Sequence, residues 1–140
     1  MNSEHGEYQL DTSLERIQFG VVHGWLSSTY WSPGISLDRV IAAARKSSLV
    51  VGVFLGEVQV GYLRVVSDQT TFAWICDVFV DENHRGKGLA KAMVKLALAD
   101  PNHEGLRRWV LATRDAHGVY ADCGFVPLPM PDRWMARLSG

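Results

Sequence analysis

The sequence predicts one α/β domain over residues 1–140, with a mixed, mostly antiparallel sheet, a central parallel βαβ unit and helices on both faces. Two patterns carry this prediction. Apolar, β-branched runs follow one another closely between residues 49 and 80, which is typical of antiparallel strands joined by short turns. A helix-length segment then precedes a further run at 109–112, and strand, helix and strand in this order form a parallel unit.

The first part of the chain predicts one short strand and two helices. The strand lies near Tyr8 to Leu10. Apolar side chains recur at helical spacing from Leu14 to Trp25, so a helix is expected there that ends at the Ser27-Ser28 pair. Ser36 suits the N-cap of a second helix, from Leu37 to Lys46, which has one apolar face.

Three strands are expected in the middle of the chain. Leu49 to Leu55 and Val58 to Val66 flank Gly56-Glu57, a pair suited to a tight hairpin turn. A third strand runs from Thr70 to Val80. Asp77 is the one charge inside it, which indicates a strand covered on both faces in the middle of the sheet.

The last third predicts alternating helices and strands. A helix from Gly86 to Ala99 leads to a parallel strand at Trp109 to Ala112. A short helix follows, capped by Asp115 and ended by Gly124 in a left-handed conformation. A closing strand is expected within Trp134 to Leu138.

Charge and composition exclude several classes of function. Fourteen Lys and Arg residues against fifteen Asp and Glu residues give a net charge of -1, so nucleic-acid binding is not expected. Cys76, Cys123 and the five histidines show no metal-binding spacing, and no metal is expected. The most apolar run, Leu49 to Leu55, is too short to span a membrane, and the start has no signal peptide pattern. We therefore expect a cytoplasmic protein.

The junction between the third long strand and the helix after it is suited to bind an anion. The first N–H groups of a helix lack intrahelical partners and carry the positive end of its dipole. Gly86 and Gly88 allow a phosphate close to the main chain, and Arg85 and Lys87 add cations. The spacing fits neither a Walker loop nor a dinucleotide fingerprint. A solvated helix start with flexible glycines is the alternative.

This junction resembles motif A of the GNAT N-acetyltransferase superfamily, Gln/Arg-x-x-Gly-x-Gly/Ala, and a second family pattern, Ala-x-x-x-Tyr followed by Gly-Phe, occurs later in the chain. The order of the predicted elements is also similar to that family over nearly the whole chain. The matching residues are Arg85, Gly88 and Ala90 in motif A, and Ala116, Tyr120, Gly124 and Phe125 in the second pattern.

The resemblance implies acetyl-CoA as co-substrate. Its pyrophosphate would lie on the helix start, and its pantetheine would pair with the backbone of the preceding strand. Many family members carry an Asn where this chain has Thr113, whose hydroxyl can still donate one hydrogen bond. The implied cofactor-binding residues are Val78, Phe79, Val80, Arg85, Gly86, Lys87, Gly88, Leu89, Ala90, Thr113 and Ala116.

Two candidates serve the proton transfers of acetylation. A primary ammonium with a pKa near 10.4 must lose a proton before attack, and Asp77 is the candidate base. An ion pair with Arg64, or a bond from a backbone donor, is the alternative role for Asp77. The departing thiolate needs a proton, and Tyr120 resembles the family's general acid. Without the family match, Tyr120 would be interpreted as a core aromatic.

The acceptor is expected beside an aromatic cluster formed by Trp25, Tyr30 and Trp31, because the family places this segment as one wall of its acceptor site. Aromatic rings can hold a cation or a ring, and they can also form a hydrophobic seam. The resemblance implies a small-molecule or peptide amine as acceptor and leaves a homodimer open. A non-catalytic domain that binds acyl-CoA and an unrelated phosphate-binding module are the competing hypotheses.

Overall fold

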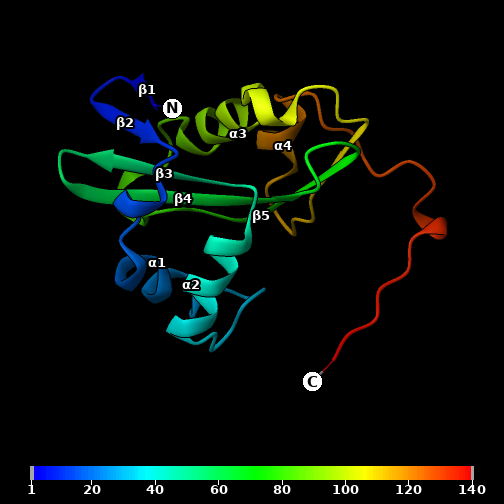
Figure 1. The fold of residues 1–140 in the computed structure, drawn as a ribbon, viewed down its shortest axis with the longest axis horizontal. Helices are drawn as coiled ribbons and strands as arrows, with labels where there is room; N and C mark the ends of the chain where they lie inside the picture. Colours follow the sequence, from blue (N-terminus) through cyan, green and yellow to red (C-terminus); the bar gives the residue numbers. More distant parts are fainter. Residues whose placement is uncertain (1, 140) are drawn as a thin grey trace.

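The computed structural model describes residues 2–139, which form a six-stranded mixed sheet with helices on both faces (Figure 1). The strands follow chain order across the sheet; the first five pair antiparallel, and the last pair is parallel. The strands are β1 (Asn2–His5), β2 (Tyr8–Asp11), β3 (Leu49–Leu55), β4 (Val58–Ser67), β5 (Phe72–Val80) and β6 (Arg108–Val110), and the α-helices are α1 (Phe19–Leu26), α2 (Leu37–Lys46), α3 (Leu89–Ala99) and α4 (His117–Ala121). The predicted fold class is confirmed.

The middle strands match the sequence pattern closely. The β3–β4 hairpin turns at Gly56, whose φ of 60° is a left-handed conformation that glycine adopts without a steric penalty. The parallel pairing of β5 with β6 confirms the βαβ unit. β1 was not predicted, because it is polar and shows no strand pattern; it pairs antiparallel with β2 at one edge of the sheet.

Two hydrophobic clusters cover the two faces of the sheet. In Figure 1, α3 and α4 lie on one side of the strands and α1 and α2 on the other. Burial of each large apolar side chain contributes roughly 1.5 to 3 kcal/mol, so both helix layers are firmly attached. The α3 side contains Leu10, Val51, Val53, Leu63, Ile75, Leu89 and Met93, and the α1–α2 side contains Val22, Leu26, Val40, Ala44, Val50 and Tyr62.

Two predicted helix starts were too early. The first predicted helix begins only at Phe19, after a 3-10 turn at Leu14–Arg16. Gln18 does not continue a helix, because its backbone N–H donates to the side-chain carbonyl of buried Gln59 at 2.7 Å. The helix predicted from residue 86 begins at Leu89, because two glycines before it have left-handed φ angles.

The C-terminal part differs most from its prediction. Asp115 does not cap the short helix; the N-cap is Ala116, whose N–H donates to the Thr113 hydroxyl at 3.2 Å. Gly124 has the expected positive φ, 94°. No strand forms at residues 134–138 within the described chain, so the predicted closing strand is wrong. Prolines 127, 129 and 131 lack N–H donors, and Pro131 begins a 3-10 turn at Pro131–Arg133. The segment leaves the body of the domain (Figure 1).

Candidate active site

The two parallel strands separate and open a cleft. β5 pairs with β6 only over Phe72–Trp74, whereas β5 itself continues to Val80. The backbone edge of β5 beyond Trp74 therefore faces a cleft instead of a strand, in the part of the chain that the structure describes. The cleft has a volume of about 1300 Å³, and its walls include Trp25, Tyr30, Val78, Phe79, Val80, Arg114 and Tyr120. An unpaired strand edge of this kind can bind an extended ligand through main-chain hydrogen bonds.

The start of α3 forms the far end of this cleft. Gly86 and Gly88 have φ angles of 78° and 76°, and the first hydrogen bond of the helix runs from the Ala92 N–H to the Gly88 carbonyl. The N–H groups before Ala92 therefore lack helical acceptors. A Cβ at Gly86 would meet no atom within 4 Å, so space is open at the main chain. These features fit a pyrophosphate.

Most residues predicted at this position line the cleft: Arg85, Gly86, Gly88, Leu89 and Ala90. Lys87 does not line it. Its carbonyl instead accepts a hydrogen bond from His5 Nε2 at 2.7 Å. The two residues of this hydrogen bond are far apart in the sequence, so no local pattern predicts it.

The N-terminal hairpin supports the loop before α3, a contact that was not predicted from the sequence. His5 on β1 holds the Lys87 carbonyl, and the Tyr8 hydroxyl on β2 lies 2.8 Å from His84 Nδ1. The two rings of Tyr8 and His84 also pack edge to face, with centroids 5.7 Å apart. The conformation of residues 84–88 thus depends on β1 and β2 as well as on the glycines of this loop.

Arg85 is held at the rim of the cleft. Its Nε donates to the Val80 carbonyl at 2.9 Å, and its guanidinium lies 5.3 Å from the centre of the Phe79 ring. Phe79 in turn stacks on Trp25 of α1, at 5.2 Å and with an interplanar angle of 22°. This stack fixes the guanidinium close to the end of β5 while leaving part of it free for an anion.

A second pocket, of about 580 Å³, adjoins the first. Its walls include Arg64, Trp74, Cys76, Asp77 and Thr113, and Tyr30, Trp31, Val78, Ala116 and Tyr120 border both pockets. Thr113 therefore lies on the second pocket only, and its hydroxyl is occupied by the Ala116 N–H. The two pockets meet at Tyr120.

Tyr120 is the one residue common to both pockets that is buried, with 8% of its surface exposed. Burial is the main cause that raises its pKa to about 12, and Tyr30, Cys123 and Asp115 add to the effect. Its ring packs edge to face against Phe125 with centroids 6.1 Å apart. The hydroxyl is therefore protonated at neutral pH and can act as a proton donor at the junction.

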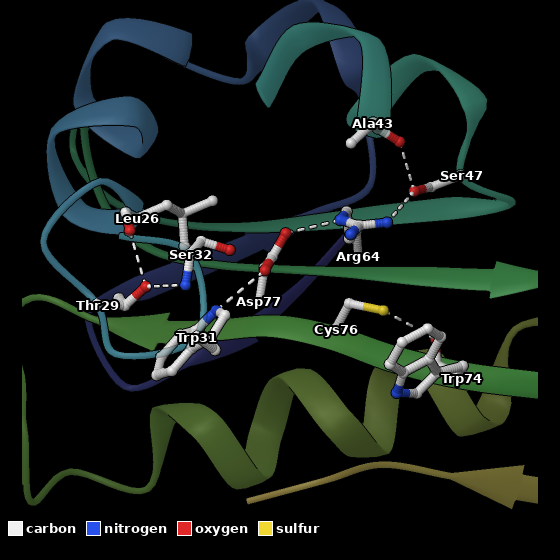
Figure 2. Close-up of polar contacts among 10 residues, drawn as sticks. All are labelled: Leu26, Thr29, Trp31, Ser32, Ala43, Ser47, Arg64, Trp74, Cys76 and Asp77. Atoms are coloured by element: carbon white, nitrogen blue, oxygen red, sulfur yellow. Dashed lines mark hydrogen bonds and ion pairs between the residues drawn. The ribbon is translucent and has the colours of Figure 1, made fainter. Parts of the chain in front are cut away.

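Asp77 lies in a bulge of β5. Between the pairs Tyr62–Phe79 and Arg64–Cys76, β5 contains one residue more than β4, and Asp77 has a φ of 56°. Such a backbone conformation costs roughly 1 to 3 kcal/mol in a residue other than glycine. The bulge turns the carboxylate towards the α1–α2 side, as Figure 2 shows.

Both oxygens of Asp77 accept hydrogen bonds (Figure 2). Arg64 Nε donates to one at 2.7 Å, and Trp31 Nε1 donates to the other at 3.1 Å. Burial opposes the charge of Arg64, but the hydrogen bond and charge of Asp77 outweigh burial and raise the Arg64 pKa. Arg64 Nη1 reaches the Ser47 hydroxyl at 3.5 Å, which connects the pair to the end of α2. The ion pair that the sequence analysis left open is therefore present, and the role of Asp77 as a base stays a prediction.

The aromatic segment between α1 and α2 crosses the junction of the two pockets. The Tyr30 hydroxyl accepts the Arg114 N–H at 2.9 Å, and the Arg114 guanidinium lies 4.0 Å above the Tyr30 ring. Tyr30 and Trp31 are 46% and 42% exposed, so they do not form a buried seam. Trp25 lies deeper, against Phe79.

Cys76 also lines the second pocket. Burial raises the pKa of Cys76 to about 11, so this thiol is protonated and not a nucleophile at neutral pH. Within residues 2–139, no group of three His, Cys, Asp or Glu side chains is arranged to hold a metal ion. None of the helices described there is both long and apolar enough to cross a bilayer.

Comparison with known proteins agrees with this geometry. The model of the acetyltransferase (GNAT) family matches residues 12–125. A protein of Gibberella zeae whose name assigns it to the acetyltransferases is 27% identical in an alignment of 137 positions that covers 81% of this chain and 76% of the relative. A crystal structure from Xanthomonas campestris pv. campestris, assigned to GNAT acetyltransferases, is 41% identical with a TM-score of 0.90, covering 94% of this chain and 93% of its own.

A more distant structure shares the fold alone. Glucosamine-6-phosphate N-acetyltransferase from Arabidopsis thaliana is 18% identical, with a TM-score of 0.67 over 94% of this chain and 97% of its own. The family model and the Xanthomonas structure place the chain among the acetyltransferases. Because the family model spans well over half of the sequence, the chain belongs to the GNAT family.

Proposed function

We propose that this protein transfers the acetyl group of acetyl-CoA to a primary amine of a small molecule or peptide, by direct attack of the amine and with Tyr120 as the general acid. The observation that carries the proposal is the position of Tyr120, buried and protonated where a cofactor-sized cleft meets a smaller pocket. A reaction between two bound partners needs such a junction.

The larger cleft suits acetyl-CoA. The first turn of α3, with open space at Gly86, suits the pyrophosphate, and Arg85 adds a cation at the rim. The main chain of Val78–Val80 offers N–H and C=O groups to the amides of pantetheine. Acetyl-CoA supplies the activated acyl thioester.

The smaller pocket suits the acceptor. Trp31 and Trp74 give it an aromatic wall, and Asp77, although paired with Arg64, can accept a hydrogen bond from an ammonium group. Deprotonation of that ammonium at neutral pH costs roughly 4 to 5 kcal/mol. Each carboxylate oxygen of Asp77 keeps a second lone pair beside its bond to Trp31 or Arg64, so Asp77 can accept the proton directly or through water.

The thiolate leaves towards Tyr120. A phenol whose pKa is about 12 holds its proton throughout the pH range in which the amine becomes nucleophilic. Tyr120 therefore donates the proton as the carbon–sulfur bond breaks, and solvent returns a proton to the phenolate afterwards.

A thiol-release assay over a panel of amines tests this function. With acetyl-CoA as donor, we expect thiol release that depends on the amine and yields the acetylated amine by mass spectrometry. CoA binding without turnover for any amine in the panel would instead favour a non-catalytic acyl-CoA-binding domain. Thermal stabilisation by ATP or NAD but not by CoA would contradict both, since a ligand at about 100 times its Kd adds about 2.7 kcal/mol.

A further inference from the structure

The second pocket presents one positive and one negative side chain that have no ion-pair partner in the described chain. Its charged residues are two arginines and two aspartates: Arg64, Asp77, Arg114 and Asp115. Arg64 and Asp77 neutralise each other through their ion pair at 2.7 Å. Neither Arg114 nor Asp115 forms an ion pair within residues 2–139. The pocket therefore has no net negative charge to attract a polyamine or a basic peptide, but it offers one separate cation and one separate anion.

Arg114 is held at the junction of the two pockets with its side-chain donors unused. Its backbone N–H donates to the Tyr30 hydroxyl at 2.9 Å, and its guanidinium lies 4.0 Å from the centre of the Tyr30 ring. No side-chain N–H of Arg114 donates a hydrogen bond to another residue of the described chain. A guanidinium can bind both oxygens of a carboxylate at once, so Arg114 is suited to hold a carboxylate group.

The position of Arg114 favours the acceptor over the cofactor as the source of that carboxylate or other anion. The proposed site of the cofactor pyrophosphate is the start of α3, where Arg85 supplies a cation. Arg114 borders the second pocket as well as the cleft, whereas no residue from 85 to 91 borders the second pocket. An anionic group of the acceptor can therefore reach Arg114 from the second pocket.

Asp115 places a negative charge near the proposed proton donor. Burial is the main cause that raises the pKa of Tyr120, and the charge of Asp115 adds to it, so this carboxylate lies close to the junction. An ammonium group at the junction is attracted by Asp115. Because Arg114 and Asp115 are consecutive residues, an amine and a carboxylate that are carried close together on one molecule match the two charges.

Two exposed indole rings line the same pocket. Trp31 and Trp74 are 42% and 47% exposed. Trp31 Nε1 donates to Asp77 at 3.1 Å, and Figure 2 shows Trp31 beside Asp77 and Trp74 further along β5. Rings that remain open to solvent inside a pocket are suited to stack on an aromatic ring of a ligand. The pocket volume of about 580 Å³ is in the range of small-molecule sites, roughly 300 to 1,000 Å³.

From these observations we infer that the acceptor is an aromatic α-amino acid, whose carboxylate binds Arg114 and whose ring lies against Trp31 and Trp74. The inference rests on the proposed acetyl transfer for its reaction and on the second pocket for its recognition. The nitrogen–carbon bond forms as the carbon–sulfur bond of acetyl-CoA breaks. One ammonium form of the amino acid and one acetyl-CoA then give the N-acetyl amino acid, the CoA thiol and one proton.

Matched substrates test the carboxylate contact. L-Tryptophan and tryptamine share the ring and the amine, but tryptamine lacks the carboxylate. We expect the parent to prefer L-tryptophan in kcat/KM, and Arg114→Gln to lower that preference about 10- to 100-fold, as the loss of a charge-assisted hydrogen bond predicts. The different basicity of the two amines is the same for both enzymes and cancels in this comparison. Arg107→Gln is the matched control, because Arg107 is exposed and lines neither pocket.

Trp74→Ala tests the ring contact. It should lower kcat/KM for L-tryptophan about 2- to 10-fold relative to L-alanine, which has the same amine and carboxylate but no ring. Trp134→Ala is the matched control, since Trp134 is also exposed, at 40%, and lines neither pocket. An equal effect of Trp74→Ala on both amino acids would overturn the aromatic part of the inference.

Binding measurements separate this inference from the proposed acetyl transfer. Titration of the CoA-loaded protein with L-tryptophan measures affinity without turnover, and Arg114→Gln should weaken this binding about 10- to 100-fold. Turnover of amines with a preference that Arg114→Gln leaves unchanged would overturn the inference while acetyl transfer stands. Binding of L-tryptophan that depends on Arg114, without turnover of any amine, would support the recognition and contradict acetyl transfer. Loss of CoA affinity in Arg114→Gln would assign this residue to the cofactor and overturn the inference.

Discussion

The two pockets that meet at Tyr120 are built in different ways. One end of the large cleft, the proposed anion-binding end, comes from one continuous segment, residues 85–90, whose glycines and helix start are visible in the sequence. The smaller pocket is assembled from distant parts of the chain, and the bonds that shape it join Arg64 to Asp77, Trp31 to Asp77 and Tyr30 to Arg114. A short local sequence is therefore enough to form the first site. The shape of the second pocket depends on residues of several elements, so a single substitution in any of them can change it.

Tyr120→Phe should have the largest effect, because this residue serves both pockets. Loss of one positioned proton donor typically lowers the rate by about 10²- to 10⁴-fold, or roughly 3 to 5 kcal/mol. We expect that fall in kcat with nearly unchanged CoA affinity, measured by steady-state kinetics and calorimetry. Tyr62→Phe is the matched control, since the Tyr62 hydroxyl is buried and unpartnered within the described chain. Activity of Tyr120→Phe within about twofold of the parent would remove Tyr120 from the mechanism.

Gly88→Glu should affect the large cleft alone. A carboxylate at the helix start repels the pyrophosphate and fills its space, so CoA affinity should fall about 100-fold, equivalent to roughly 2.8 kcal/mol. Gly105→Glu is the control for backbone strain and added charge, because Gly105 also has a positive φ, 82°, but does not line either pocket. A Cβ at Gly105 would meet no atom within 4 Å, whereas a Cβ at Gly88 would meet His5 Nε2 at 3.6 Å. Unchanged CoA affinity in Gly88→Glu, measured by titration calorimetry, would mean that the pyrophosphate binds elsewhere.

Asp77→Asn probes the smaller pocket. If Asp77 takes the proton from the ammonium, kcat/KM for the amine should fall about 10- to 100-fold at low pH, and the loss should shrink as pH rises and the free amine becomes abundant. Arg64→Gln breaks the same ion pair without removing the carboxylate. Equal pH–rate profiles for the two variants would assign Asp77 a structural role.

His5→Ala should produce the smallest effect. The variant loses one hydrogen bond to the Lys87 carbonyl, worth about 0.5 to 1.5 kcal/mol, so CoA affinity should fall about 2- to 10-fold. Glu4→Ala, an exposed neighbour on β1, should leave the affinity unchanged. If both variants bind CoA like the parent, the hairpin does not support the large cleft.

The difference between the pockets also explains what could be predicted from the sequence. The β3–β4 hairpin, the βαβ unit and the residues around Gly86 and Gly88 were predicted because turn glycines, periodicity and helix starts are local signals. The hydrogen bond from His5, the contact of Arg114 with Tyr30 and the bulge at Asp77 depend on distant segments of the chain. No local sequence pattern indicates them. The prediction of a closing strand was wrong for a related reason: residues 134–138 have a strand pattern but no strand partner within the described chain.

The central claim is that the Tyr120 hydroxyl gives its proton to the leaving sulfur. The most direct test is the pH dependence of kcat after Tyr120 is replaced by a fluorinated tyrosine, whose ring packs similarly but ionises at lower pH. The acid works only while protonated, so with a pKa of about 12 the parent should keep its activity well above pH 10, the pKa of an ordinary tyrosine. The fluorinated enzyme should lose activity at a lower pH that follows the phenol's ionisation. An identical profile for both enzymes would contradict the account.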